Sequence, residues 1–310
     1  MRKAFVEAIS EILDTNDKAL LLIGDIGAYL LKDISAKHPN RVINMGIAEA
    51  GMMSAAVGLA LEGWIPFVYT ITPFVTARAY DQIRAGVGYH EANVKIVGIG
   101  SGLSYSALGG THHSIEDIAM MRSIPGMTII SPSDGPETIQ ATKATANHFG
   151  PVYLRLMLNV EPLAIDIKRK EFKIGQAKKL SNGKDLTIIA TGELVKEALD
   201  VSAMLQKDKI YASIINMSTI KPIDKKTIES EVISAPIIFT LEEHNVIGGL
   251  GSGVAEVISE SKLKSKPRLV RLGIQDKFTN KYGHKSELYE YLNLDAKSLY
   301  KRVKKEIKNG

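Results

Sequence analysis

NMGIAEAGMMSAAVGLA, residues 44–60, places a single carboxylate, Glu49, among apolar and very small side chains. Apolar residues recur at helical spacing and predict a helix over residues 47–61, with one apolar stripe formed by Met53, Val57 and Leu61. A second face has almost no side chains, because it consists of Ala48, Gly51, Ala55 and Gly58. Since the side chains at a contact set the distance between two helices, this face predicts a tight packing seam with an acid near the helix start.

The role of Glu49 stays open at the level of single residues. An acidic residue in the first turn of a helix complements the helix dipole and needs no functional explanation. A carboxylate in apolar surroundings is nevertheless unusual, and it makes Glu49 a candidate for chemistry.

Strand-like and helix-like segments alternate outward from this stretch. Strands are predicted at residues 20–24, 42–44, 65–69, 94–97, 127–131 and 152–156. Helices are predicted at residues 3–13, 75–85 and 115–123, and one more begins after Ser133, where Pro136 stands early in the helix. This alternation favours a parallel sheet with helices on both faces.

A second α/β domain is predicted after a lysine-rich break. The chain has 310 residues, more than one hydrophobic core usually supports. Apolar runs stop between residues 161 and 183, and we place a linker at 166–184 between domains 1–165 and 185–310. The second half repeats the alternation with fewer elements, and residues 285–307 are predicted to form closing helices. The fold class is therefore α/β, with two doubly wound domains of which the second is smaller.

Composition excludes several classes of protein. The net charge is +5, but the aromatic content is only 6% and the basic residues near the end alternate with acids, which predicts a solvated basic face and no nucleic-acid partner. No apolar run is long enough to cross a bilayer, and acids follow the first basic residues where a signal peptide would need an apolar core. The absence of cysteine excludes disulfides and thiolate chemistry. We expect a cytoplasmic protein without membrane contact.

Polar and glycine-rich clusters follow several predicted strands, where open parallel sheets bind ligands. His112, His113, Glu116 and Asp117 precede a predicted helix, but without a third well-spaced ligand they are a weak candidate for a metal site. The run 248–253, GGLGSG, follows a strand but lacks the register of a dinucleotide-binding turn. A tight turn between strand and helix is the simpler interpretation.

Five motifs in order carry a family resemblance: NMGIAEAGMMSAAVGLA, PFVTARAYDQIR, NVKIVGIGSGL, GGTHHSIEDIAMMRSIPGMTIISPSD and TLEEHNVIGGLGSGVAE. They resemble the C-terminal two-thirds of transketolases and deoxyxylulose-phosphate synthases, and most of all the free-standing C-terminal subunit of split transketolases. The resemblance spans about residues 3–300. It implies a thiamine diphosphate enzyme whose first domain binds the cofactor's pyrimidine and whose second is the family's C-terminal domain, without a direct catalytic role.

The resemblance also implies roles for individual residues. Glu49 matches the glutamate that contacts the pyrimidine ring nitrogen and promotes the tautomer that removes the thiazolium proton; burial would raise its pKa, which suits that role. His112 matches a histidine that faces the reacting centre, although His113 stands where the family usually has Gln. Phe74 lies where the family stacks an aromatic ring on the pyrimidine, and Arg78 follows it. Asp25 resembles an acidic position near the cofactor, with a simple turn aspartate as the alternative.

Two departures from the family concern the substrate. Leu108 stands where the family has an Asp that contacts a donor hydroxyl, and Leu158 stands where it has an Arg that binds the sugar phosphate. A phosphate without cationic or amide donors is poorly held. We therefore expect a non-standard or non-phosphorylated substrate, or an anchor supplied by another chain or by Arg155.

A partner subunit is expected as well. The family binds magnesium and the diphosphate through a G-D-G motif followed by an Asn, and no G-D-G occurs in this sequence. We expect thiamine diphosphate and Mg²⁺ to be held largely by an N-terminal, diphosphate-binding partner, in a heterotetramer of two plus two subunits that acts on small sugars. No metal ligand is assigned to this chain.

The main expectation is thus transfer of a two-carbon ketol unit from a ketose donor to an aldehyde acceptor. Two alternatives remain at this stage. The first is the beta subunit of a 2-oxoacid dehydrogenase, or an enzyme like deoxyxylulose-phosphate synthase. The second is a non-catalytic scaffold subunit whose site has decayed, which Leu108 and Leu158 would permit.

Overall fold

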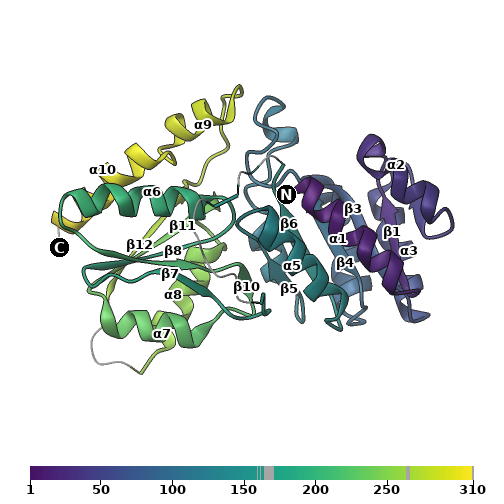
Figure 1. Ribbon diagram of the computed structural model, residues 1–310, viewed down its shortest axis with the longest axis horizontal. Coiled ribbons are helices and arrows are strands. Elements are labelled where there is room, and N and C mark those ends of the chain that lie inside the picture. Colours follow the sequence, from purple (N-terminus) through teal and green to yellow (C-terminus); the bar gives the residue numbers. More distant parts are fainter. Residues whose placement is uncertain (159, 161, 164–170, 263–265, 309–310) are drawn as a thin grey trace.

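The computed structural model describes residues 1–158, 160, 162–163, 171–262 and 266–308, which form two α/β domains side by side (Figure 1). Each domain has one mostly parallel sheet between two layers of helices. The predicted fold class is confirmed. Within the described residues, no helix combines the length and the apolar character that crossing a membrane requires.

The sheet of the first domain has the strand order β10-β5-β6-β4-β3-β1-β2. Its strands are β1 (Ala19–Ile23), β2 (Val42–Asn44), β3 (Ile65–Ile71), β4 (Lys95–Ile99), β5 (Thr128–Ile130), β6 (Val152–Leu156) and β10 (Thr219–Lys221). All neighbours pair in parallel except β10, which comes from the second half of the chain and pairs antiparallel with β5. The second half of the chain therefore extends the first sheet, which the sequence analysis did not predict.

Helices cover both faces of this sheet because its strands carry apolar side chains on both sides. One face packs on α1 (Arg2–Thr15), α2 (Ala28–Lys37) and α5 (Gly135–Ala146). The other packs on α3 (Glu49–Leu61), α4 (Asp117–Arg122) and the π-helical segments η1 (Phe74–Arg78) and η2 (Gln82–Gly88). The side chains alternate accordingly: Leu21 lies in the first cluster and Leu22 in the second.

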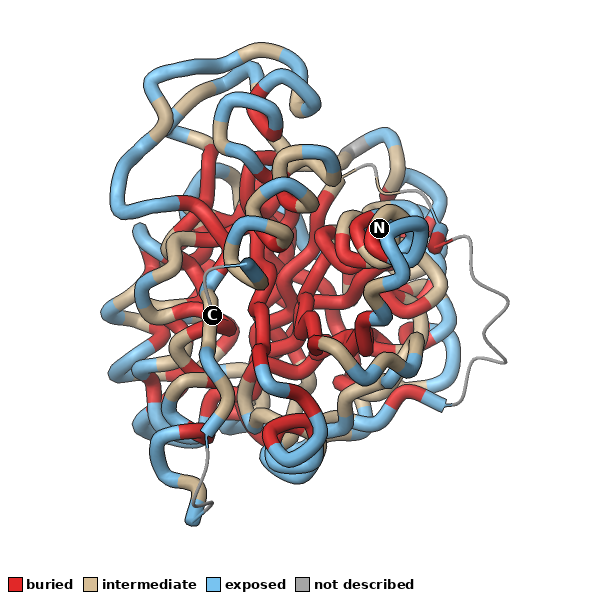
Figure 2. Tube along the Cα trace, turned by 90° about the vertical axis from the view of Figure 1, so that its left-hand side faces the viewer, coloured by how far each residue is buried: buried red, intermediate tan, exposed pale blue. Residues whose placement is uncertain are grey.

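The second sheet has the order β12-β11-β8-β9-β7. Its strands are β7 (Lys178–Ser181), β8 (Leu186–Ala190), β9 (Ala212–Asn216), β11 (Ile237–Asn245) and β12 (Arg268–Ile274). One face packs on α6 (Leu194–Lys207), α9 (Lys285–Leu292) and α10 (Ala296–Lys308), and the other on α7 (Lys225–Ser234) and α8 (Leu250–Glu260). Figure 2 shows the buried residues gathered in the middle of the molecule. The antiparallel edge strand β7 lies inside the stretch predicted as linker, so the second sheet begins before residue 185.

Two local predictions differ from the structure. Residues 75–85, predicted as one helix, form η1 and η2 with wide π-helical turns, which are frequent at functional sites. The helix α2 was not predicted; it begins after Gly27, whose positive φ of 80° suits a glycine at a tight turn.

The helix α3 agrees with its prediction in position but not in packing. Met53 is buried, whereas Leu61, predicted on the same apolar stripe, is 60% exposed. Gly51 and Gly58 are exposed, and a Cβ atom added at Gly58 would meet nothing within 4 Å. The small-residue face is therefore not a seam within the described part of this chain.

Candidate active site

Glu49 begins α3 at the edge of the sheet where β1, β2 and β3 end. The preceding turn is held by Asn44, whose Oδ1 accepts the Gly46 amide at 3.0 Å. Glu49 is only 5% exposed, and its Oε2 lies 3.6 Å from Arg78 Nη1. Within the described residues no hydrogen-bond donor of the protein reaches this carboxylate closely. One buried carboxylate is thus left able to bond a ligand.

Phe74, Arg78 and His112 adjoin Glu49 in a continuous series of contacts. The Arg78 guanidinium lies 3.9 Å from the centre of the Phe74 ring, a cation–π contact made possible because both residues lie on η1. The Phe74 ring meets the His112 ring edge to face, with centroids 5.1 Å apart. The structure therefore brings four of the five predicted site residues together, although they come from three separate segments.

His112 stands in the loop 100–116 between β4 and α4. Its Nδ1 lies 2.9 Å from the Thr111 hydroxyl. Burial, and then the positive charge of Arg78, hold the pKa of His112 below its ordinary value of 6.5. The imidazole is therefore neutral at pH 7, the form that accepts a proton.

Asp25, the fifth predicted residue, stands apart from this group. It follows β1 with a positive φ of 52°, and its Oδ1 accepts a hydrogen bond of 3.0 Å from Asn44 Nδ2. Asn44 Oδ1 accepts the Asp25 amide in return, at 3.2 Å. These two hydrogen bonds connect the ends of β1 and β2. Asp25 therefore has the structural role that is typical of an aspartate in a turn. Asp25 contacts neither Glu49 nor His112 within the described chain.

Sequence reasoning missed Tyr105 and Arg2, which lie at the same edge. The Tyr105 ring lies 5.6 Å from the His112 ring and crosses Gly100, where an added Cβ would come within 2.0 Å of it. Arg2 Nε donates to the Tyr69 hydroxyl at 3.2 Å. One signal could have singled out Arg2: a cation in the first turn of a helix opposes the helix dipole. Tyr105 had no comparable signal.

Arg155 does not serve as the alternative phosphate anchor that the sequence analysis allowed. It is 1% exposed, its Nε donates to Asp117 Oδ2 at 2.7 Å, and its Nη2 donates to the Glu243 carbonyl at 3.0 Å. The Tyr153 hydroxyl donates to the same Asp117 oxygen at 2.6 Å. Arg155 is therefore enclosed as the counter-ion of Asp117. Leu108, by contrast, is 52% exposed beside the site.

The glycine-rich turn 248–253 is a turn between strand and helix. At the N-terminus of α8, Glu242 accepts the amides of Leu250 at 2.7 Å and Gly251 at 2.8 Å. An internal carboxylate thus takes the place that a phosphate would need, and the dinucleotide hypothesis is wrong.

The histidine-rich cluster does not form a metal site. Asp117 is paired with Arg155, Glu116 accepts the amide of Ile115, and His113 Nε2 contacts the Ser106 carbonyl. No group of three or more possible metal ligands occurs anywhere in the described part of the chain.

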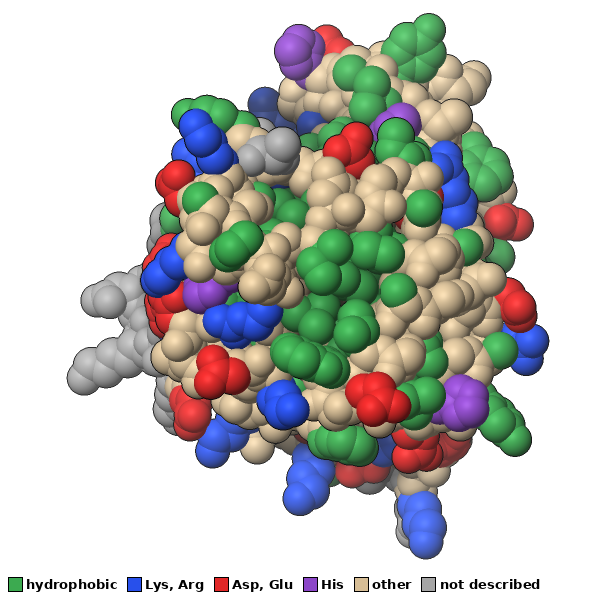
Figure 3. All heavy atoms as spheres, turned by 90° about the vertical axis from the view of Figure 1, so that its right-hand side faces the viewer, with side chains coloured by type: hydrophobic (Ala, Val, Ile, Leu, Met, Phe, Trp, Pro, Cys, Tyr) green, Lys and Arg blue, Asp and Glu red, His purple; other side chains and the backbone are tan. Residues whose placement is uncertain are grey.

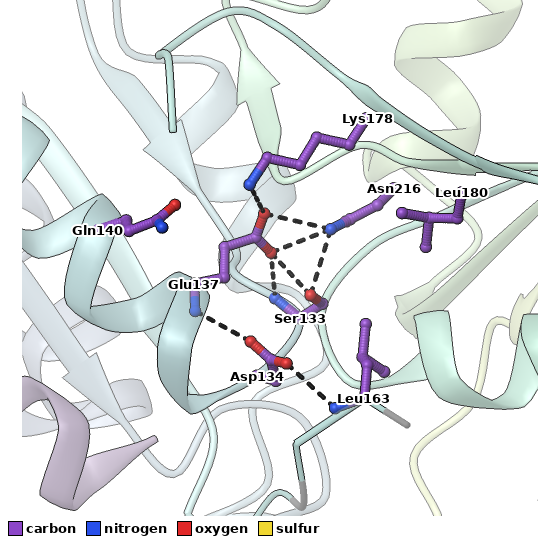
Figure 4. A pocket seen from close by; sticks show the side chains of 8 residues that line it. All are labelled: Ser133, Asp134, Glu137, Gln140, Leu163, Lys178, Leu180 and Asn216. Carbon is purple, nitrogen blue, oxygen red and sulfur yellow. Dashed lines mark hydrogen bonds and ion pairs between the residues drawn. The ribbon is translucent and has the colours of Figure 1, made fainter. Parts of the chain in front are cut away.

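A small cavity between the two domains is too small for a cofactor or a sugar. It measures about 20 Å³ and is lined by Glu137, Ser133, Lys178 and Asn216, among others (Figure 4). Glu137 accepts hydrogen bonds from Ser133 and Asn216 and pairs with Lys178 at 3.2 Å. This volume has room for about one water molecule. The cluster joins the domains and is not a candidate active site.

The fold and this edge define a two-domain α/β protein whose site is built on the first sheet. The sequence matches the family "Transketolase, pyrimidine binding domain" over residues 1–158 and "Transketolase, C-terminal domain" over residues 175–299. The chain belongs to the transketolase family. That family implies thiamine diphosphate and a divalent metal as cofactors.

Three comparisons agree with this assignment. The chain is 39% identical to a putative transketolase C-terminal section of Methanocaldococcus jannaschii, over 99% of this chain and 96% of that protein. It is 37% identical to a 6-deoxy-6-sulfo-D-fructose transketolase subunit of a Clostridium species, over 96% and 92%. A solved split-gene transketolase, described as an inactive beta4 tetramer, superposes with a TM-score of 0.88 at 35% identity, covering 99% of this chain and 97% of that one.

Proposed function

We propose that this chain is the pyrimidine-binding and C-terminal subunit of a split, transketolase-like enzyme that transfers a two-carbon ketol unit from a ketose donor to an aldehyde acceptor. The observation that carries the proposal is the group formed by Glu49, Arg78, Phe74 and His112 at the carboxyl edge of the first sheet. The length match with free-standing relatives supports the split organisation.

The site fits the pyrimidine half of thiamine diphosphate. When bound, this cofactor supplies the nucleophilic carbon that takes up the two-carbon unit. Glu49 would bind the ring nitrogen through a hydrogen bond with its buried carboxyl group, which no donor of the described chain approaches closely. Phe74 would offer an aromatic surface, and Arg78 would keep the carboxylate oriented. Asp25 stays a proposed neighbour of the cofactor, acting through the turn that it forms with Asn44.

His112 would move protons on the substrate. Because its pKa is lowered, it is ready to accept a proton from a substrate hydroxyl at neutral pH and to return it later. Its ring contact with Tyr105 limits its rotation.

An N-terminal partner subunit would bind the diphosphate and Mg²⁺ and complete the site, in a heterotetramer of two plus two. Hydrophobic side chains gather on the end of the molecule that carries α2 and α3 (Figure 3). Ile47 is 75% exposed there, and the small-residue face of α3 lies nearby without a covering helix in the described chain. Exposed apolar surface of this kind marks protein contacts.

The substrate is proposed to differ from an ordinary sugar phosphate. Leu108 offers no hydrogen bond beside the site, and Arg155 is enclosed. Arg2 and Tyr105, at the same edge of the sheet, are groups that could bind an anionic end of a sugar. An assay of the reconstituted complex with xylulose 5-phosphate and ribose 5-phosphate tests this point. Turnover like that of an ordinary transketolase would refute the non-standard substrate but not the split-enzyme proposal.

Replacing Glu49 with Gln tests the function itself. General acid–base groups contribute about 10²–10⁴-fold to a rate, so we expect a loss of that size in the turnover of the complex. Glu62→Gln, at the opposite end of the same helix, is the matched control and should leave the rate unchanged. An unaffected rate in the Glu49 variant would favour the scaffold alternative.

A further inference from the structure

The loop 100–116, which carries Tyr105 and His112, packs against the second domain at both of its ends. The ends of its outer part, Leu103 and Ile115, are buried within the hydrophobic cluster formed by the second sheet, α6, α9 and α10. An isolated bridge between Gly102 and Ser114 closes the base of the loop, with hydrogen bonds of 3.0 and 2.9 Å. A loop of the first domain thus packs its two ends into the core of the second.

Glu243, at the end of β11, binds the loop backbone directly. Its Oε1 accepts the Leu103 amide at 2.5 Å. A Cβ atom added at Gly102 would come within 2.6 Å of the same oxygen, so the backbone lies against the carboxylate. Glu243 is 1% exposed, and a hydrogen bond to a buried charged group is among the stronger ones in a protein.

The other carboxylate oxygen of Glu243 is fixed by α9. The Tyr289 hydroxyl lies 2.6 Å from Oε2, and Lys285 Nζ lies 3.2 Å from it. Both groups also contact Glu193, at the start of α6. Burial raises the pKa of Glu243, while the Lys285 cation opposes that rise. Glu243 therefore joins the loop to α9 directly, and to the start of α6 through Tyr289 and Lys285.

Two more hydrogen bonds from the second domain reach the loop. The Asn245 amide donates to the Ile115 carbonyl at 2.7 Å, and the Gly283 amide donates to the Ser106 carbonyl at 3.2 Å. The backbone hydrogen bonds within residues 104–113 are local turns, such as that from Leu108 to Tyr105. Local turns alone do not fix where a loop points, so the contacts from the second domain do so together with the Leu158 amide and the Phe74 ring of the first domain.

We propose that Glu243, in the second domain, is a positioning residue for the active site, which holds the loop that carries Tyr105 and His112 against Phe74. The second domain then fixes the position of the loop that carries His112, in addition to its part in the fold. The role of His112 in this inference rests on the proposed function. The contacts by which Glu243 holds the loop, however, are a property of the isolated chain. The two are tested separately.

Hydrogen exchange of the isolated chain, followed by mass spectrometry, measures how firmly the loop is held and does not require turnover. We expect Glu243→Ala to speed exchange in residues 103–113 by about tenfold or more, because a buried hydrogen bond to a charged group is lost. Glu231→Ala is the matched control: Glu231 is also buried in the second domain, but it binds Thr187 and Lys179 instead of the loop. Glu243→Asp keeps the negative charge but shortens the side chain, so that it no longer reaches the loop. If the alanine variant does not fold, the exchange rates of this aspartate variant test the proposal.

The second readout is the pKa of His112, followed by NMR titration of the same variants. A loosened loop exposes the imidazole, so the lowered pKa should rise toward its ordinary value in Glu243→Asp and not in Glu231→Ala. In the reconstituted complex, kcat should fall about tenfold while the affinity for thiamine diphosphate stays unchanged, and Glu243→Gln, which keeps an acceptor for Leu103, should restore most of kcat. Unchanged loop exchange in Glu243→Asp, or equal loosening in the control, overturns the inference.

Discussion

At the residue scale, one arginine acts on three neighbours in the site. Arg78 pairs with Glu49 at 3.6 Å and lies over the Phe74 ring, and its charge helps to lower the pKa of His112. The same cation thus contacts Glu49 and favours a neutral His112. An acid and a base in different environments are the usual arrangement for proton transfer at neutral pH.

Arg78→Gln tests this coupling. Removing the cation removes one of the two causes of the lowered pKa, so the pKa of His112 should rise, with burial still holding it partly down. The protonated fraction of His112 between pH 6 and 7 then grows, and the acid limb of the pH–rate profile shifts to higher pH. NMR titration of the isolated chain measures the first effect. Arg84→Gln, an exposed arginine paired with Asp81, is the control and should change nothing.

Residue positions were predictable where neighbours in sequence carried the signal. Glu49 and Phe74 lie in compact motifs, so the place of Glu49 on α3 and the place of Phe74 close before Arg78 followed from the sequence. Arg2 and Tyr69 are 67 positions apart, and Leu103 and Glu243 are 140 apart. Such contacts depend on how the sheets are ordered and packed, and spacing along the chain does not encode them. Arg155 was left open as an anchor for the same reason, because its partner Asp117 comes from another element.

At the element scale, α3 and α8 present their helix termini in opposite ways. At α8, Glu242 accepts the first two free amides, those of Leu250 and Gly251, from within the chain. At α3, the acid is the first helical residue, and the small-residue face beside it has no helix packed on it in the described chain. The N-terminus of α8 is thus capped by a residue of this chain, whereas the small-residue face at the start of α3 is left free for a contact with another chain.

Bulking out the small face of α3 should affect assembly before stability. A Cβ added at Gly51 meets only Ala48 Cβ, at 4.0 Å, so Gly51→Leu should fold normally. Replacing glycine inside a helix gains about 0.5–1 kcal/mol of stability. The partner subunit should nevertheless bind more weakly, by about tenfold or more in sedimentation or light-scattering titrations. Asp200→Leu, on exposed α6, is the control. Normal assembly of the Gly51 variant would show that this face is not the seam.

Glu242 gives α8 a measurable pH signature. Burial raises the pKa of Glu242 from 4.5 to about 7, so between these values the folded chain binds a proton that the unfolded chain has lost. Its stabilising contribution is therefore complete below pH 4.5 and is lost as the pH rises through 7. Relative to Glu242→Gln, the wild-type chain should lose on the order of 2–3 kcal/mol of unfolding free energy between pH 5 and pH 8. Denaturant titrations at both pH values measure it, and an equal difference at the two would contradict it.

At the scale of the whole molecule, the domain order was predictable and the joint between the domains was not. Alternating strands and helices predicted two α/β domains, because periodicity is local. The joint consists of β10 added to the first sheet, the Glu137 cluster and the loop held by Glu243. Each of these unites residues far apart in sequence, and each makes the two domains one support for the site.

The whole molecule also presents only half of the proposed site. The group at Glu49 lies at an open edge of the first domain, with exposed apolar surface nearby, and the family implies a cofactor whose diphosphate end requires other ligands. The proposed active site is therefore a composite one, shared with a partner chain.

Calorimetric titration of thiamine diphosphate with Mg²⁺ tests this claim most directly. The isolated chain should show no binding, because it supplies only the pyrimidine side of the site. The complex reconstituted with its N-terminal partner should bind one cofactor per pair of subunits. Stoichiometric tight binding to the isolated chain would contradict the account.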